Sequence, residues 1–169
     1  DLASAGVGAS GHLGGALFES LTNTKMMHIP YKGMSLAIVD VMSGQVTMTF
    51  GTSLSVVPHA RAGRLRALAT TGAQRSPALP ELPTIAEVIP GYEASLWYGF
   101  AAPAKLPPEI LNRLHAALVA TLQLPDVRER LASQGLDVQH NTPEEFSKLL
   151  AADVARWAKV IERLGIQVE

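Results

Sequence analysis

The tightest constraint on the fold comes from residues 28–33, whose sequence is His-Ile-Pro-Tyr-Lys-Gly. This segment ends an apolar stretch over 26–29 and precedes a helical pattern over 35–42, in which Leu36, Val39 and Met42 fall on one face. Gly44 then releases the chain into a second strand-like stretch, 46–50. Two strands joined by a crossover helix form a parallel βαβ unit, which binds ligands at the carboxyl ends of its strands. The pattern therefore predicts an α/β fold around a cleft for a small ligand.

The same alternation extends in both directions along the first half of the chain. A glycine-rich turn over 4–11 precedes a helical pattern over 12–21, which leads into the apolar stretch at 26–29. Further on, Ser53 or Ser55 can begin a short helix that ends at Gly63, and residues 65–71 have the pattern of another buried strand.

The second half is predicted to be mainly helical. Four prolines between 77 and 90 mark a connecting segment, interrupted by a short helix over 84–88 that Thr84 and Glu87 cap. Residues 96–102 have the pattern of a strand, and we place a boundary near 91–95. Helices are then predicted from Pro107 and Pro108 to residue 122, over 126–134, and over 143–164, the last capped by Thr142 and ended by glycine.

Composition excludes several classes of function. The formal net charge is -1, which offers no basic surface for nucleic acid or for an anionic membrane. The chain has no cysteine, so it has no thiolate nucleophile, and its 5 histidines lack the short spacing of metal ligands. We therefore expect no metal and no cofactor. No apolar run approaches the ~20 residues that span a bilayer, and no segment has the pattern of a signal peptide. Because it begins at Asp1, we expect a mature, trimmed or engineered piece.

The glycine-rich turn is compatible with two kinds of ligand. Residues 6–11 match the spacing of a dinucleotide fingerprint, so a small nucleotide-binding α/β enzyme is one alternative. That fingerprint also needs an acidic residue at the end of the second strand, where this chain has Ile29, Pro30, Tyr31 and Lys32 instead. Free N–H groups before a helix N-terminus suit a carboxylate equally well, without any charged side chain. We favour the carboxylate, and no catalytic base and acid can be assigned for an enzyme.

Five short motifs together resemble one family. They are Ser-Ala-Gly-Val-Gly at 4–8, the segment 28–33, Gly-Gln-Val at 44–46, Arg-Ala-Gly-Arg-Leu-Arg-Ala-Leu-Ala at 61–69, and Leu-Pro-Thr-Ile-Ala-Glu at 82–87. This set resembles the Bug (TctC-like) periplasmic solute-binding proteins of tripartite tricarboxylate transporters. The resemblance implies a doubly wound, periplasmic binding protein-like (type II-like) domain 2 over residues 1–92. Residues 93–169 would then be a strand and three helices that return to an incomplete domain 1.

The resemblance also implies a ligand site at the turns that follow the strands. The glycine-rich turn after residue 4 would supply hydroxyl and backbone groups. The turn at Tyr31 and Lys32 would supply an aromatic ring and a cation, and the turn over 51–53 would supply further hydroxyls and free N–H groups. The family commonly has Asp after Gly-Gln-Val, whereas this chain has Thr47, which removes one acidic group. The candidate ligand-binding residues are Ser4, Ala5, Gly6, Gly8, Ser10, His12, Tyr31, Lys32, Gly51, Thr52 and Ser53.

The implied function is capture of a small carboxylate in the periplasm and its delivery to the membrane permease subunits of the transporter, with no reaction catalysed. A sensor accessory protein on the same scaffold would differ only in its membrane partner, and the sequence leaves that alternative open. The apolar stripes of the C-terminal helices, such as Leu111, Leu114 and Leu118, have no obvious cover. We therefore expect self-association through these faces.

Overall fold

A parallel sheet of three short strands lies at the start of the chain in the computed structural model, which describes residues 1–166. The central strand β1 (Leu2–Ser4) lies between β2 (His28–Pro30) and β3 (Met48–Thr49). Leu2 is in register with both His28 and Met48. Every residue of β1 is buried, because it has a neighbouring strand on each side and helices pack against it. The predicted α/β class is confirmed.

Three helices follow these strands in turn. They are α1 (Ser10–Thr22), α2 (Met34–Met42) and α3 (Ser53–Arg61), and each begins within two residues of its predicted start. A small apolar core forms where α2 covers the sheet, with Ala3, Ala37 and Val46 fully buried. The crossover arrangement predicted from residues 28–33 is therefore present, with β2 and β3 on opposite sides of β1.

The three α-helices of the second half also form as predicted. They are α4 (Pro108–Leu122), α5 (Pro125–Ser133) and α6 (Pro143–Leu164), and a single 3-10 turn, η1 (Ile85–Glu87), replaces the predicted helix over 84–88. At the start of α6 the Thr142 hydroxyl accepts from the Glu145 N–H at 3.2 Å, and the Glu145 carboxylate accepts from the Thr142 N–H at 2.8 Å. This reciprocal pair satisfies two N–H groups that a helix start otherwise leaves free.

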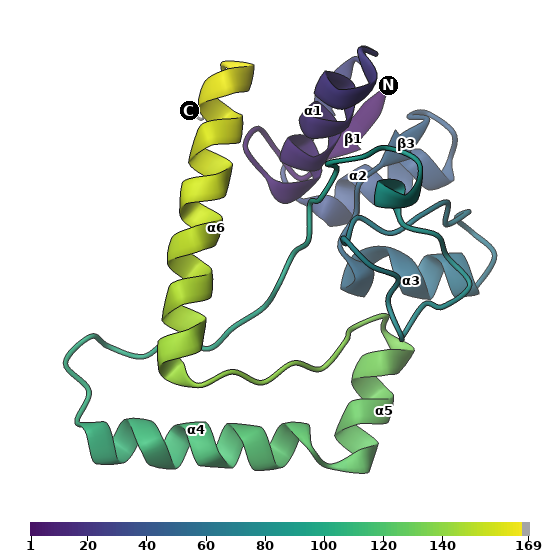
Figure 1. Cartoon of the computed structure of the whole chain (residues 1–169). Helices are drawn as coiled ribbons and strands as arrows, with labels where there is room; N and C mark the ends of the chain where they lie inside the picture. Colours follow the sequence, from purple (N-terminus) through teal and green to yellow (C-terminus); the bar gives the residue numbers. More distant parts are fainter. Residues whose placement is uncertain (167–169) are drawn as a thin grey trace.

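The helices of the second half form an open arm. Figure 1 shows α6 standing beside α1, α4 lying away from the sheet, and α5 turning back toward α3. Near α3, the Arg61 guanidinium donates to the carbonyl of Ser133. Near α1, α6 packs against that helix. Within the arm, the Trp97 indole N–H donates to Asp153 on α6 at 3.1 Å, and Asp153 also accepts from Arg156 at 2.6 Å. The arm thus contacts the α/β unit through α5 and α6.

Two predicted strands are wrong. Residues 65–71 form a turn and an irregular stretch, in which Thr70 makes one isolated bridge to Thr84. Residues 96–102 have no strand partner within the described part of the chain. A strand needs a neighbour to satisfy its backbone groups, and the pattern of a single segment does not supply one. Tyr98 and Phe100 are consequently left exposed.

The apolar stripe of α4 is open, as the sequence predicted. Leu114 is 49% exposed, and no residue of α4, α5 or α6 is fully buried. Among the described residues, no helix combines the length and apolar character needed to cross a membrane. The division of the chain near 91–95 stays a prediction, and residues 167–169 of the predicted arm lie outside the described residues.

Candidate functional site

Three turns meet at one edge of the sheet. Because β1, β2 and β3 are parallel, their last residues lie at the same edge. The turns 5–9, 31–33 and 50–52 leave from that edge, and the N-termini of α1, α2 and α3 follow them directly. The backbone N–H groups at a helix start have no partner within the helix and carry a partial positive charge. This edge therefore offers converging donors for an anion.

Close backbone approaches hold the three turns together. The Tyr31 N–H donates to the carbonyl of Ser4 at 3.0 Å, which joins the first two turns. A Cβ atom placed on Gly6 would lie 3.5 Å from the Tyr31 carbonyl oxygen, and one placed on Gly11 would lie 2.5 Å from the Phe50 carbonyl oxygen. The second distance is too short for a side chain, so glycine at position 11 is what allows α1 to start against the third turn. The structure thus brings the three predicted groups of site residues to one place.

The first turn needs two glycines and is fixed by the hydroxyl of Ser4. Gly6 and Gly8 have φ values of 137° and 76°, which side chains rarely adopt. The Ser4 hydroxyl accepts from the Gly6 N–H at 3.2 Å and lies 3.0 Å from the Gly6 carbonyl oxygen. Ser4 itself is fully buried, so its side chain holds the turn and is not accessible to a ligand.

A pair of stacked imidazole rings supports this turn. The rings of His12 and His28 lie 4.0 Å apart at an angle of 6°. His12 Nδ1 accepts from the Gly8 N–H at 3.0 Å, and His28 Nε2 lies 2.6 Å from the Ser4 hydroxyl. The sequence pointed to His12 and missed His28. The one available signal was that His28 begins the strand beside β1, which carries Ser4.

The surroundings of the two rings oppose their protonation. Burial lowers the pKa of His12 below 6.5, and the charge of Glu19 partly offsets this effect. Burial also lowers the pKa of His28, and a charge on His12 lowers it further. Both rings are therefore mainly neutral at pH 7.

The second turn presents its backbone and a free cation. The Tyr31 hydroxyl donates to Asp40 on α2 at 2.6 Å, and this bond raises the pKa of Tyr31. Its ring packs against the core of the α/β unit. Lys32 is exposed and makes no ion pair within residues 1–166. Of the two predicted side chains, only Lys32 is free to attract an anion in solution.

The third turn leads into α3. A Cβ on Gly51 would collide with the Val56 side chain, so glycine allows the turn to close on the helix. The Thr52 hydroxyl lies 2.9 Å from the Ser55 hydroxyl, and Ser53 is the first residue of α3. Thr47 lies elsewhere, because its N–H donates to Asp1 at 2.7 Å at the other end of the strands. The departure from the family pattern at that position therefore lies away from the candidate site.

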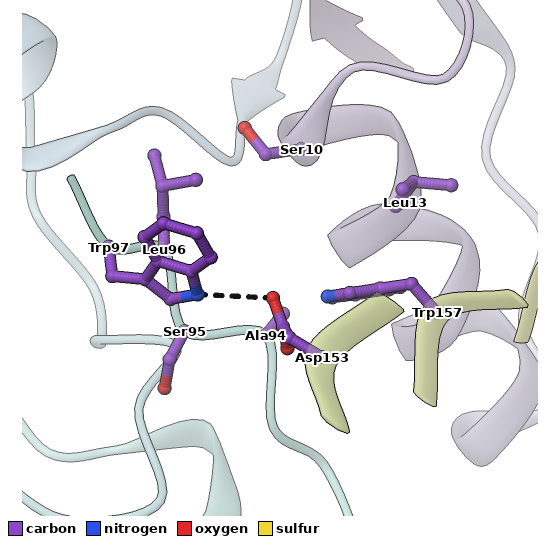
Figure 2. Close-up of a pocket in the computed structure, with 8 residues that line it drawn as sticks. All are labelled: Ser10, Leu13, Ala94, Ser95, Leu96, Trp97, Asp153 and Trp157. Atoms are coloured by element: carbon purple, nitrogen blue, oxygen red, sulfur yellow. Dashed lines mark hydrogen bonds between the residues drawn. The ribbon is translucent and has the colours of Figure 1, made fainter. Parts of the chain in front are cut away.

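A cavity of about 280 Å³ adjoins the site on the side of the arm. Figure 2 shows Ser10 and Leu13 of α1 on one side, with Trp97 and its bond to Asp153 opposite and Trp157 of α6 below. Ser10, Ala5, Gly6 and Gly8 are all at least partly accessible. Within the described residues, no three His, Asp or Glu side chains gather in a way that could hold a metal ion.

Comparison with known proteins identifies the family to which this arrangement belongs. Residues 1–166 match the model of TctC, the tripartite tricarboxylate transporter family receptor. The chain belongs to the TctC family. TctC proteins form a family of receptors rather than a class of enzymes, so the nucleotide-binding enzyme is not favoured.

Two curated relatives differ in length. A UPF0065 protein in the tcbD-tcbE intergenic region of Pseudomonas sp. (strain P51) is 38% identical over 161 residues, which cover 94% of this chain and 48% of that protein. A UPF0065 protein in the clcB-clcD intergenic region of Pseudomonas knackmussii is 31% identical, over 93% of this chain and 94% of that protein. This chain thus spans about half the length of the first relative and nearly all of the second.

Two solved structures of similar proteins contain carboxylates. Rpa4515 of R. palustris, solved with adipate, matches with a TM-score of 0.89 and 34% identity, over 98% of this chain and 56% of that chain. MatC from Rhodopseudomonas palustris, with bound malate, matches with a TM-score of 0.79 and 28% identity, over 95% of this chain and 56% of that chain. Both likenesses support the periplasmic binding protein-like fold predicted from the sequence.

Proposed function

We propose that this chain forms one wall of a carboxylate site in a periplasmic receptor that delivers its solute to the permease subunits of a tripartite transporter. The observation that carries the proposal is the convergence of three helix N-termini at one sheet edge in a TctC-family chain. No reaction is needed for this role. A receptor of this kind binds, closes on its solute and is recognised by its partner.

The chemistry of the edge supports a carboxylate as the ligand. The second and third turns carry backbone N–H groups at Gly33 and Gly51, and Lys32 adds a nearby positive charge. The carboxylate of Asp40, on the helix after the second turn, is engaged by the Tyr31 hydroxyl. The structural relatives solved with adipate and with malate hold dicarboxylates of four to six carbons, which makes such acids the first ligands to test.

We expect this chain to bind adipate weakly, with a Kd on the order of 1 mM, because a single wall leaves the ligand solvated on its other side. Titration of the ¹⁵N-labelled chain with adipate measures this by amide chemical shifts. The largest shifts are expected at Gly6, Gly33 and Gly51. Adipamide has the same length without charge, so it should leave these amides unchanged. Equal shifts with adipamide, or shifts confined to the arm, would contradict a carboxylate site at this edge.

We also expect the chain to self-associate through α4. The exposed stripe on α4 includes Ile110 and Leu114, and a net charge of -1 gives little repulsion between copies. Sedimentation velocity should therefore show a mean mass that rises with protein concentration. Leu114→Glu should shift the distribution toward monomer by placing a charge in the contact. Leu68→Glu is the matched control, because Leu68 is exposed outside the arm and should leave association unchanged. A monomer at every concentration would refute the expectation.

A further inference from the structure

We propose that the stacked pair of His12 and His28 couples carboxylate binding at the first turn to uptake of a proton, with His12 as the positioning residue that changes the turn. This inference rests on the proposed carboxylate site and specifies how that site is regulated. It starts from two contacts. The Gly8 N–H donates to His12 Nδ1 at 3.0 Å, and the two rings stack at 4.0 Å.

The bond to Gly8 fixes the protonation state of His12. Because the Gly8 N–H is a donor, Nδ1 must accept, and the neutral ring carries its proton on Nε2. A second proton on Nδ1 removes that acceptor. The Gly8 N–H is then released, and the His12 Nδ1–H becomes a further donor beside it. When His12 is protonated, the turn therefore presents two donors and a positive charge. When His12 is neutral, the Gly8 N–H is bonded to the imidazole and is not available to a ligand.

His28 responds differently to a proton. The Ser4 hydroxyl has one proton and lies near both the Gly6 carbonyl oxygen and His28 Nε2, at 3.0 and 2.6 Å. When that proton points to the carbonyl, His28 donates from Nε2, and a protonated His28 can still make the same bond. Protonation of His28 thus leaves the turn as it is. A charge on His12 lowers the pKa of His28, so His12 is the ring that takes the proton and the two stacked rings are not charged together.

The other titratable groups near His12 and His28 do not account for this pH dependence. The turn 5–9 contains no titratable side chain, and β1 contributes only the Ser4 hydroxyl. Glu19 on α1 is the carboxylate that acts on both rings, and it favours their protonated forms while accepting from the Met26 N–H. An anion bound at the turn would add to Glu19 and offset the burial that keeps His12 neutral. By linkage, the anion and the proton strengthen each other's binding.

Adipate affinity should therefore increase as the pH falls. The adipate-bound chain holds the extra proton more tightly than the free chain. The affinity for adipate should therefore rise by up to about tenfold per pH unit, in the range between the His12 pKa of the bound chain and the His12 pKa of the free chain. Adipate titrations at pH 8, 7 and 6 measure this change, and the ligand's carboxyl groups stay mainly ionised over that range. In parallel, the His12 Cε1–H resonance should titrate below pH 6.5 in the free chain and at a higher pH in saturating adipate.

Three variants separate the roles. In His12→Asn the side-chain oxygen can accept from the Gly8 N–H but does not titrate, so adipate should still bind, with an affinity that no longer depends on pH. His28→Gln should keep the pH dependence, because His12 and its bond to the Gly8 N–H remain. His140→Gln is the control, since His140 is exposed in the loop before α6 and should leave both readouts unchanged.

The outcomes of the titrations are distinct. An affinity that rises toward pH 6 in the unaltered chain and is flat in His12→Asn supports the proposal. Adipate binding with no dependence on pH, or an unchanged slope in His12→Asn, overturns it and leaves the carboxylate site standing. A His12 midpoint that adipate does not move, while the amides of the turn report binding, overturns it as well. Absence of adipate binding at every pH would instead refute the carboxylate site, and this inference with it.

Discussion

Tyr92→Ala is expected to lower the free energy of unfolding by about 3–5 kcal/mol, the range for truncation of a large buried aromatic side chain. Tyr92 is 1% exposed and packs with Phe18 and Phe50, whose ring centroids lie 6.3 and 6.4 Å from its own. Its hydroxyl donates to the carbonyl of Gly14 at 3.2 Å. Since domains of this size are stable by only about 5–15 kcal/mol, this loss should be a large part of the total.

Urea unfolding followed by circular dichroism measures the effect, with Tyr98→Ala as the matched control. Tyr98 is the same residue type six positions later and is 60% exposed, so its truncation should change the free energy of unfolding by no more than about 0.5 kcal/mol. Tyr92→Phe keeps the ring and loses only the hydroxyl bond, so an intermediate cost of about 1 kcal/mol is expected. Equal effects at positions 92 and 98 would show that the aromatic cluster is not the core of this unit.

The position of Tyr92 explains why this effect reaches the site. Phe18 lies on α1, and Phe50 is the first residue of the third turn, so the three rings join the helix that follows the first turn to the start of the third. Ala94, two residues after Tyr92, donates to the Thr71 carbonyl at 2.9 Å. The cluster thus holds α1 against the third turn of the candidate site, at the point where the chain leaves toward the arm.

Helices were predictable because their signals are local. The predicted span of α6 matches the structure because Thr142, Glu145 and Gly165 act within one turn of the helix ends. The two wrong strands failed for the opposite reason. Residues 65–71 and 96–102 have apolar strand patterns, but a strand forms only where another strand presents free backbone groups to it. In the described part of the chain, residues 96–102 have no such neighbour, and residues 65–71 have only the isolated bridge from Thr70 to Thr84.

The candidate site also has some features that could be predicted from the sequence and others that could not. The three turns could be placed at one edge from the sequence, because the order of strands and helices fixes where parallel strands end. The contacts between turns could not be predicted. The stacking of His12 on His28 depends on how α1 lies over β2, and the bond of Tyr31 to Asp40 depends on the turn before α2. A side chain's partner across the fold is decided by packing, which no short motif encodes.

Gly11→Ala is expected to damage the site by forcing α1 and the third turn apart. The new Cβ would lie 2.5 Å from the Phe50 carbonyl oxygen, and a backbone atom cannot turn away as a side chain can. Overpacking of this kind costs about 1–3 kcal/mol, which outweighs the gain of up to about 1 kcal/mol from replacing glycine within a helix. Since the third turn must move away from the first, the adipate-induced amide shifts at Gly6 and Gly51 should be lost together.

Gly14→Ala provides the matched control one turn further along the same helix. Its Cβ would meet the Tyr92 hydroxyl at 3.4 Å and the Ala94 Cβ at 3.6 Å, which are ordinary contacts. This variant should be as stable as the unaltered chain or up to about 1 kcal/mol more stable, with adipate binding kept. Urea unfolding and the adipate titration compare the two variants directly. If Gly11→Ala matched Gly14→Ala in both, the turns would not need close contact between α1 and the third turn, and the candidate site would have to be built from each turn separately.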